Sequence, residues 1–191
     1  MTPSDPQYRI DVIRIKEIMI PIEDYPSVSP ETTIHEAMAI MEQASLHVAG
    51  RRSLPRVLLV LDEQGVLKGT VRRRDIMRGL EPKYLVTQPL NYRKKLFDVS
   101  IDPNLSQLSP SHLVKGIREQ AEKPVSTVMR PIEIGIEAND HVIKAIYEMV
   151  GYGLTLLPVV EDGNLVGIVR TVELFKELSH IVHFLEEDLA E

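Results

Sequence analysis

The 191-residue sequence contains no cysteine, which excludes disulfide bonds and thiolate metal sites. It also lacks any apolar run near the ~20 residues that a membrane-spanning helix needs. Its N-terminus has an acidic residue and no apolar segment of the kind that a secretion signal carries. An excess of positive charge is absent as well: 28 acidic residues against 22 Lys and Arg give a net charge of -6 at pH 7, whereas non-specific nucleic-acid binding needs a basic surface. We therefore expect a cytoplasmic protein that binds neither nucleic acid nor a membrane.

Motifs of known catalytic chemistry are missing too. The sequence has no glycine-rich phosphate loop of the Walker type, no Gly-x-Ser-x-Gly nucleophile elbow and no His-Glu-x-x-His helix. The spacing of His180, His183 and Glu187 can hold a divalent metal, but without cysteine or another obvious ligand we expect a helix face there. The sequence therefore predicts no catalytic residues, no metal site and no required cofactor, and we expect the chain not to be an enzyme.

Two stretches of the chain share one frame. GTVRRRDI at 69–76 and GIVRTVEL at 167–174 both read glycine, two apolar or small residues, arginine, two further residues, an acid and an aliphatic residue. Such a repetition indicates a structural unit that occurs twice, so the same order of elements is expected on either side of each stretch.

The second half of the chain predicts the order strand, helix, strand, strand, helix. Val142, Ala145, Ile146 and Met149 follow the spacing of one buried helix face. The other signals are a short strand at 132–136, helix N-caps at Asn139 and Asp140, a helix break at Tyr152 and Gly153, a buried strand at 156–160, a hairpin turn at 162–164, a returning strand at 165–169 and a second helix from Thr171.

The first half repeats this plan. The buried helix face recurs, and Thr33 and Glu36 have the spacing of a capping box. A strand, a glycine-containing turn and a second strand follow in VLLVLDEQGVLKGTV, after which RRRDIMRGL begins a helix. The text MIP at 19–21 also matches MRP at 129–131. The residues of the recurring helix face are Ile34, Ala37, Met38 and Met41.

Two segments have no counterpart in the other half. Met41 and Asp62 are 21 positions apart, against 12 for Met149 and Glu161, so the first half carries extra residues around 47–56. Residues 81–124, between the halves, match neither. Within them we expect a helix from Pro110 to about Ala121, capped by Ser109. The length of this middle segment favours an ordered insertion or a partner-binding surface.

With these motifs in view, the chain resembles a tandem pair of CBS (cystathionine-β-synthase) domains. LLPVVEDGNLVGIVRTVEL at 156–174 is similar to the family's LPVVD-x-G-x-LVGI text, and GVLKGTVRRRDIM and TIHEAMAIM match it in the first half. The resemblance implies an α+β fold, in which two βαββα repeats pack as a pseudo-twofold pair. Repeat 1 would span 12–80, the partly helical insertion 81–124 and repeat 2 125–185.

The resemblance also implies a ligand. CBS pairs often bind AMP, ADP, ATP or S-adenosylmethionine between the repeats, where an acid accepts hydrogen bonds from ribose and a threonine or serine helps to hold phosphate. Asp75 and Glu173 occupy the acid position of the two repeats, but Arg72 and Arg170 stand in place of the hydroxyl residue. An arginine cannot cap a helix N-terminus, yet it can form a fork with phosphate oxygens. The expected ligand-binding residues are Asp75, Arg72, Arg73, Arg74, Glu173, Arg170, Thr171, Leu157, Pro158 and Val159.

Two interpretations of function remain open. In the first, the chain is a homodimeric regulatory module that senses an adenine nucleotide or a related anion and modulates a partner protein not named by the sequence. In the second, Arg72 and Arg170 point to solvent or pair with acids, no nucleotide binds, and the chain is a dimerisation or docking scaffold that uses 81–124.

Overall fold

The computed structural model describes residues 13–48, 50–81, 110–132 and 134–188. Within it the chain forms two compact units, neither of which is a continuous piece of sequence. Unit 1 comprises Met1–Pro26, Leu46–Ser53 and Ile132–Glu191, and unit 2 comprises Ser27–Ser45 and Leu54–Pro131. The first unit therefore holds most of the second repeat together with two segments of the first half, so the division in space does not follow the order of the repeats in sequence.

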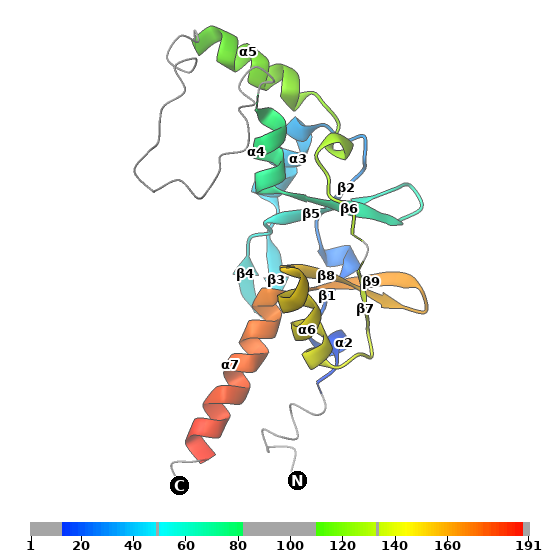
Figure 1. The fold of residues 1–191 in the computed structure, drawn as a ribbon, viewed down its shortest axis with the longest axis vertical. Coiled ribbons are helices and arrows are strands. Elements are labelled where there is room, and N and C mark those ends of the chain that lie inside the picture. The colour runs from blue at the N-terminus through cyan, green and yellow to red at the C-terminus, as the bar shows by residue number, and fades with distance from the viewer. Residues whose placement is uncertain (1–12, 49, 82–109, 133, 189–191) are drawn as a thin grey trace. The chain divides into compact units, whose positions relative to one another are not determined.

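Unit 2 contains the first repeat as a small sheet with helices packed on it (Figure 1). The sheet order is β2-β5-β6, with β2 parallel to β5 and β5 antiparallel to β6. Helix α5 lies in contact with α3 and α4. The elements are β2 (Ser27–Val28), α3 (Ile34–Gln43), β5 (Val57–Leu61), β6 (Leu67–Arg72), α4 (Arg73–Leu80), α5 (Pro110–Ala121) and the 3-10 helix η4 (Val125–Thr127).

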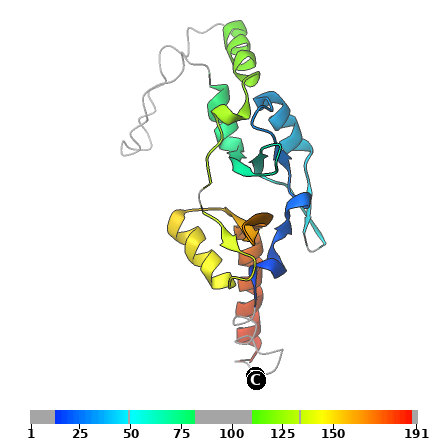
Figure 2. The ribbon, with the colours of Figure 1, turned by 90° about the vertical axis from the view of Figure 1, so that its right-hand side faces the viewer.

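Unit 1 contains the second repeat on a four-stranded sheet of order β1-β9-β8-β7 and a separate β3-β4 hairpin. Helices α6 and α7 are in contact (Figure 2). No helix of the described ranges is both long and apolar enough to cross a membrane. The elements are α2 (Ile15–Ile18), β1 (Ile20–Pro21), η1 (Ile22–Asp24), β3 (Leu46–Val48), β4 (Arg51–Ser53), β7 (Ile136–Glu137), α6 (Val142–Tyr152), β8 (Leu156–Glu161), β9 (Asn164–Arg170) and α7 (Thr171–Asp188).

The predicted duplication is confirmed, because both repeats have the order β, α, β, β, α apart from the β3-β4 hairpin inserted after α3, and they also share strand register. In repeat 1, Val60 pairs with Gly69 and the register shifts at the next residue. In repeat 2, Val159 pairs with Gly167 and the register shifts at the same point. A bulge bends and twists the strand that carries it, so a bulge at the same place gives the two hairpins the same local shape.

The helix faces predicted from apolar spacing are the ones that form the cores. Ile34, Ala37 and Met41 of α3 pack with residues of β5, β6 and α4, and each is at most 3% exposed. Val142, Ala145 and Met149 of α6 are equally buried against β8 and β9. Met38 and Ile146 lie beside these faces and are partly buried. Burial of these side chains supplies most of the favourable energy of folding. Each repeat is therefore stabilised by its own core, and the two cores are formed by corresponding sets of residues.

Several local signals of the sequence are confirmed. The Thr33 hydroxyl accepts a hydrogen bond from the Glu36 backbone at 3.1 Å, and the Glu36 carboxylate accepts one from the Thr33 backbone at 2.9 Å. Helix α6 ends at Tyr152, and Gly153 follows in the left-handed conformation that suits glycine. Positive φ angles at Asp162 and Gly163 make the tight turn between β8 and β9. Helix α5 has the predicted bounds, whereas Ser109 and residues 82–109 of the insertion lie outside the described residues.

Two local predictions are wrong. The N-cap of α6 is His141, whose Nδ1 accepts from the backbone of Ile143, and not Asn139 or Asp140. Asp140 instead accepts from the backbone of Glu137 and from Lys144. The strand expected at 132–136 is also shorter and later, because β7 is only Ile136–Glu137. Both errors arise where a turn precedes the helix, since a turn and a helix start favour the same residue types.

Each unit is completed by a segment that comes from the other half of the sequence. Strand β1 of the first half pairs with β9, placing Ile20 opposite Ile168 and Pro21 opposite Gly167. Arg130, near the start of the second repeat, forms an isolated bridge with Thr70 of β6 through two backbone hydrogen bonds of 2.8 and 2.9 Å. We call these two pieces, 19–21 and 129–131, the crossing segments.

Glycine makes room for both crossing segments. A Cβ at Gly69 would overlap the carbonyl oxygen of Arg130, and a Cβ at Gly167 would lie 2.7 Å from the carbonyl oxygen of Ile20. Neither glycine has a positive φ. The requirement at these positions is therefore close backbone approach, which is one of the two reasons for a glycine inside a strand.

Gly69→Ala and Gly167→Ala should each lower the free energy of unfolding by about 1–3 kcal/mol, because the added methyl displaces a crossing segment. Gly151→Ala is the matched control: nothing lies within 4 Å of its Cβ position in α6, so the change should be neutral or stabilise by up to about 1 kcal/mol. Urea unfolding measures all three. Wild-type stability in both strand variants would contradict the close approach.

Candidate functional site

The start of α4 is built without a loop, because β6 runs directly into the helix. Arg72 is the last residue of β6 and the N-cap of α4, and it provides no side-chain acceptor for the free backbone N–H groups of the first turn. Asp75 is three residues further on, where its carboxylate accepts from the backbone N of Arg72 at 3.2 Å. The guanidinium of Arg72 donates to the same carboxylate, so this arginine is paired with Asp75 and does not cap the helix as a hydroxyl residue would.

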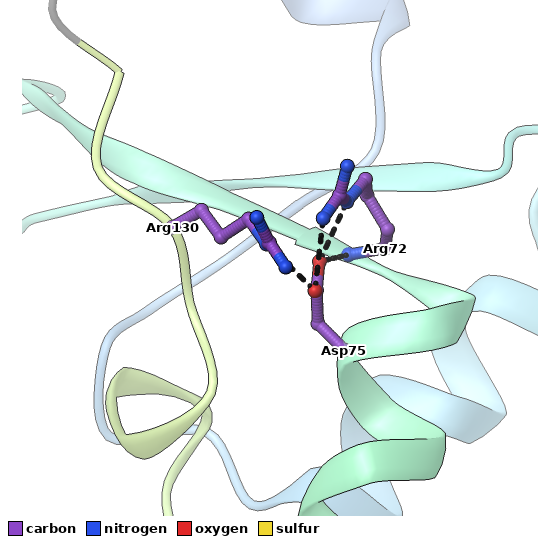
Figure 3. Close-up of polar contacts among 3 residues, drawn as sticks. All are labelled: Arg72, Asp75 and Arg130. Atoms are coloured by element: carbon purple, nitrogen blue, oxygen red, sulfur yellow. Dashed lines mark hydrogen bonds and ion pairs between the residues drawn. The ribbon is translucent and has the colours of Figure 1, made fainter. Parts of the chain in front are cut away.

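Asp75 is the centre of this arrangement (Figure 3). Its Oδ2 accepts from Arg72 Nε at 2.8 Å, and its Oδ1 accepts from Arg72 Nη2 at 3.0 Å. Arg130, from the crossing segment, adds Nε at 2.8 Å from Oδ1. The side chain of Asp75 is only 2% exposed. Two guanidiniums from distant parts of the sequence thus meet on one buried carboxylate.

The electrostatics of this group keep Asp75 charged. Burial alone would raise the pKa of Asp75, but hydrogen bonds from Arg72 and Arg130 outweigh that effect and lower the pKa to about 2. The same carboxylate raises the pKa of Arg72, chiefly through their hydrogen bonds. A buried charge is tolerated only when it is paired, and Asp75 meets that condition with two cations.

The start of α7 carries the equivalent pair. Arg170 Nε donates to Glu173 Oε2 at 2.9 Å, and Arg170 Nη2 donates to Oε1. Nη1 of Arg170 contacts the hydroxyl of Ser53, at the end of the β3-β4 hairpin, at 3.3 Å. Burial would lower the pKa of Arg170, but Glu173 outweighs it and raises that pKa. Burial also raises the pKa of nearby Tyr25 to about 12. Ser53 is one of the extra residues of the first half, so these residues help to cover the pair of Arg170 and Glu173.

Exposure separates the two arginine–acid pairs. At α4 the side chains of Arg72 and Arg130 are 39% and 47% exposed. At α7 the side chains of Arg170 and Glu173 are 10% and 8% exposed. The guanidiniums at α4 can thus contact a molecule from solvent, whereas those groups at α7 are enclosed by their own unit.

The remaining predicted residues divide between the units. Arg73 and Arg74 are exposed in the first turn of α4, and Arg73 reaches the carbonyl of Pro55 at 3.4 Å. Thr171 is exposed at the start of α7. Leu157, Pro158 and Val159 form a buried stretch of β8, in which Leu157 and Val159 belong to the core of unit 1. Unit 2 therefore gathers Arg72, Arg73, Arg74 and Asp75, and unit 1 gathers the other six.

Sequence reasoning missed Arg130, the second cation on Asp75. The available signal was the match of MRP at 129–131 to MIP at 19–21, in which an arginine replaces Ile20. That substitution puts a charge where the other crossing segment has a buried isoleucine. A charge at a position that is apolar in the twin repeat indicates a partner of opposite charge nearby, and Asp75 is that partner.

Comparison with known proteins gives a consistent result. The CBS domain family model matches residues 15–82 and 125–180, which is more than half of the chain. The comparison with curated proteins finds no match. Among solved structures, the CBS domain of a membrane protein from Sphaerobacter thermophilus is similar at 23% identity and a TM-score of 0.60, covering 90% of this chain and 91% of that one.

Two further solved structures have similar folds. A CBS domain-containing protein of unknown function from Bacillus anthracis is 19% identical with a TM-score of 0.60, and the match covers 92% of this chain and 99% of that one. CBSX2 in complex with AMP is 18% identical with a TM-score of 0.57, over 88% and 97% of the two chains. Identities this low show a shared fold and nothing finer.

The ion pairs of Asp75 should make stability depend on acid. Because the folded-state pKa of about 2 lies below the ordinary 3.8, the contribution is complete above about pH 4 and is lost as the pH falls toward 2. In urea unfolding, Asp75 should account for about 1–2 kcal/mol of the wild-type loss over that interval. Asp75→Asn should be missing that part of the loss, while Glu63→Gln, in the exposed β5-β6 turn, should retain it. An unchanged acid dependence in Asp75→Asn would show that the ion pairs do not form.

Proposed function

The chain belongs to the CBS domain family, and from this premise we propose that it is a regulatory module without catalytic activity of its own. Its ligand is an adenine nucleotide or a related anion, bound at the residues around the start of α4. Binding there changes the behaviour of a partner protein. The observation that carries the proposal is the pair of half-exposed guanidiniums, Arg72 and Arg130, held on the buried carboxylate of Asp75.

Charge supports a ligand of this class. The chain as a whole has a net charge of -6, yet Arg72 and Arg130 both lie on Asp75, and Arg73 and Arg74 follow in the first turn of α4. Guanidiniums form paired hydrogen bonds with phosphate oxygens. The N-terminus of α4 adds the partial positive charge of its free N–H groups. The AMP bound to CBSX2, which has the same fold, shows that this scaffold accommodates such a ligand in that protein.

Regulation would follow from linkage. A ligand shifts a partner only if it binds two conformational states with different affinity. Arg130 is well placed to transmit such a difference, because unit 2 ends at Pro131 and the chain continues into unit 1 at Ile132. A ligand that holds Arg130 acts on the stretch of backbone through which the chain passes from one unit to the other.

We also propose that the chain is a homodimer. Large apolar side chains are exposed on α6 and α7, on the sides of these helices that the core of unit 1 does not use. A second copy would bury them, since an exposed apolar face of this kind marks a protein–protein contact. Light scattering should then give twice the mass of the chain, and Phe175→Glu should reduce it. The residues are Ile143, Tyr147, Val150, Tyr152, Val172, Phe175 and Val182.

A scaffold that binds no small molecule is the second candidate, and one observation favours it. Both acids that would contact ribose, Asp75 and Glu173, are already engaged by arginines of the same chain. In this case the arginine–acid pairs only stabilise the fold of each repeat, and insertion 81–124 contacts the partner.

Titration calorimetry separates these candidates. With AMP, ADP, ATP and S-adenosylmethionine in turn, the regulatory module should give measurable heat and a shift in melting temperature with at least one ligand. Arg72→Ala should weaken a phosphorylated ligand about tenfold or more, and adenosine much less, because the guanidinium contacts phosphate. Equal weakening of both would refute the phosphate role. No heat and no thermal shift at millimolar ligand would favour the scaffold.

A further inference from the structure

The acceptor capacity of Asp75 is the first constraint on what the start of α4 can recognise. A carboxylate offers about four lone-pair positions. Asp75 accepts from the backbone N, Nε and Nη2 of Arg72 and from Nε of Arg130, so these positions are filled. A ribose diol could donate to Asp75 only by displacing one of these bonds. Since the bonds between ions are stronger than those from a neutral hydroxyl, the exchange is unfavourable.

The two guanidiniums are in the opposite situation, because they retain donors. A guanidinium carries five N–H groups. Arg72 uses Nε and Nη2 on Asp75, and Arg130 uses Nε alone. Over the parts of unit 2 that the structure describes, Nη1 of Arg72 and both Nη atoms of Arg130 donate no hydrogen bond to the protein. Figure 3 shows the guanidiniums approaching the carboxylate from two sides. An acceptor from solvent can therefore reach donors of both arginines.

The first turn of α4 also breaks a rule of helix sequences. Arg73 and Arg74 follow Arg72 at the end of the helix where positive charge opposes the helix dipole. Both side chains are exposed, so they bring no burial to offset this repulsion. A local rule broken without a gain in stability is typical of a functional position. A bound anion would attract each of these arginines and so offset the repulsion between their charges and the helix dipole.

We propose that Arg72 and Arg130 form a clamp that binds a phosphate-bearing anion through its phosphate oxygens and makes no use of a ribose diol on Asp75. Asp75 is the counter-ion of both guanidiniums, and Arg130 supplies the half of the clamp that comes from the crossing segment and not from the helix. The inference rests on the proposed function, since it names the ligand chemistry of the same site. The enclosed pair of Arg170 and Glu173 offers no such clamp, so each chain binds one anion.

The direct test compares three probes on the full-length chain by titration calorimetry, in EDTA and at fixed low salt. Tripolyphosphate carries the phosphates of ATP without the nucleoside, and adenosine carries the nucleoside without the phosphates. The clamp predicts that tripolyphosphate binds at one site per chain with a Kd within about fivefold of that for ATP. It predicts no binding of adenosine at millimolar concentration.

Variants test the roles of the individual residues, each after its melting curve has shown that it is folded. Arg130→Gln should weaken tripolyphosphate about tenfold or more, because half of the clamp is removed. Arg78→Gln, which removes the same charge from the exposed last turn of α4, should stay within about twofold of wild type. Asp75→Asn should leave tripolyphosphate binding equal or tighter, since it removes a competing anion. If Asp75 held a ribose, the same change would abolish ATP binding.

The outcomes separate this inference from the proposed function. Binding of ATP without binding of tripolyphosphate, together with loss of ATP binding in Asp75→Asn, overturns the clamp and leaves nucleotide sensing intact. Binding of tripolyphosphate without binding of ATP supports the clamp and contradicts the adenine ligand. If neither tripolyphosphate nor any of AMP, ADP, ATP and S-adenosylmethionine binds, both are contradicted and the scaffold remains. Equal loss of tripolyphosphate affinity in Arg130→Gln and Arg78→Gln also overturns the clamp, because the loss would then follow from the change in net charge alone.

Discussion

The close approach of two crossing segments to two glycines is the constraint on which the rest of the structure depends. Gly69 and Gly167 lie at the same position of the twin hairpins, and each makes room for backbone from the other half of the sequence. Neither repeat is complete without that backbone. The duplication therefore produces more than two similar folds in a row, because in each unit a strand of the sheet pairs with backbone from the other repeat's sequence.

The chemistry of the candidate site follows from this exchange. Arg130 reaches Asp75 because its own backbone is paired with Thr70, one strand residue from Gly69. The corresponding position of the other crossing segment is Ile20, which is buried and uncharged. The two crossing segments thus have similar backbones but different side chains at Arg130 and Ile20, and for this reason the two arginine–acid pairs have different surroundings. The pair at α4 has a second cation and faces solvent, whereas the pair at α7 lies beneath the β3-β4 hairpin.

The sequence predicts the local structure well and the long-range structure poorly, for a physical reason. Helix faces, the Thr33 capping box and the Asp162-Gly163 turn depend on residues a few positions apart, so spacing alone predicts them. Strand β1 has only two residues, and its partner β9 is more than 140 positions away, so no periodicity could indicate their pairing. The glycine at the head of each repeated frame was the one local sign of a close backbone contact. The sequence left open whether Arg72 and Arg170 point to solvent, bind a ligand or pair with acids. The structure pairs them with Asp75 and Glu173, and it alone brings Arg130 to the first of these acids.

Native-state hydrogen exchange of the Arg130 amide tests the central claim most directly, because that amide donates to Thr70 across the junction of the crossing segment with β6. If the crossing segment is an integral strand of unit 2, the Arg130 amide should exchange with the same opening free energy as the amides paired between β5 and β6. Fast exchange at Arg130, with β5 and β6 still protected, would show that the segment is not part of the sheet and that Asp75 lacks its second cation.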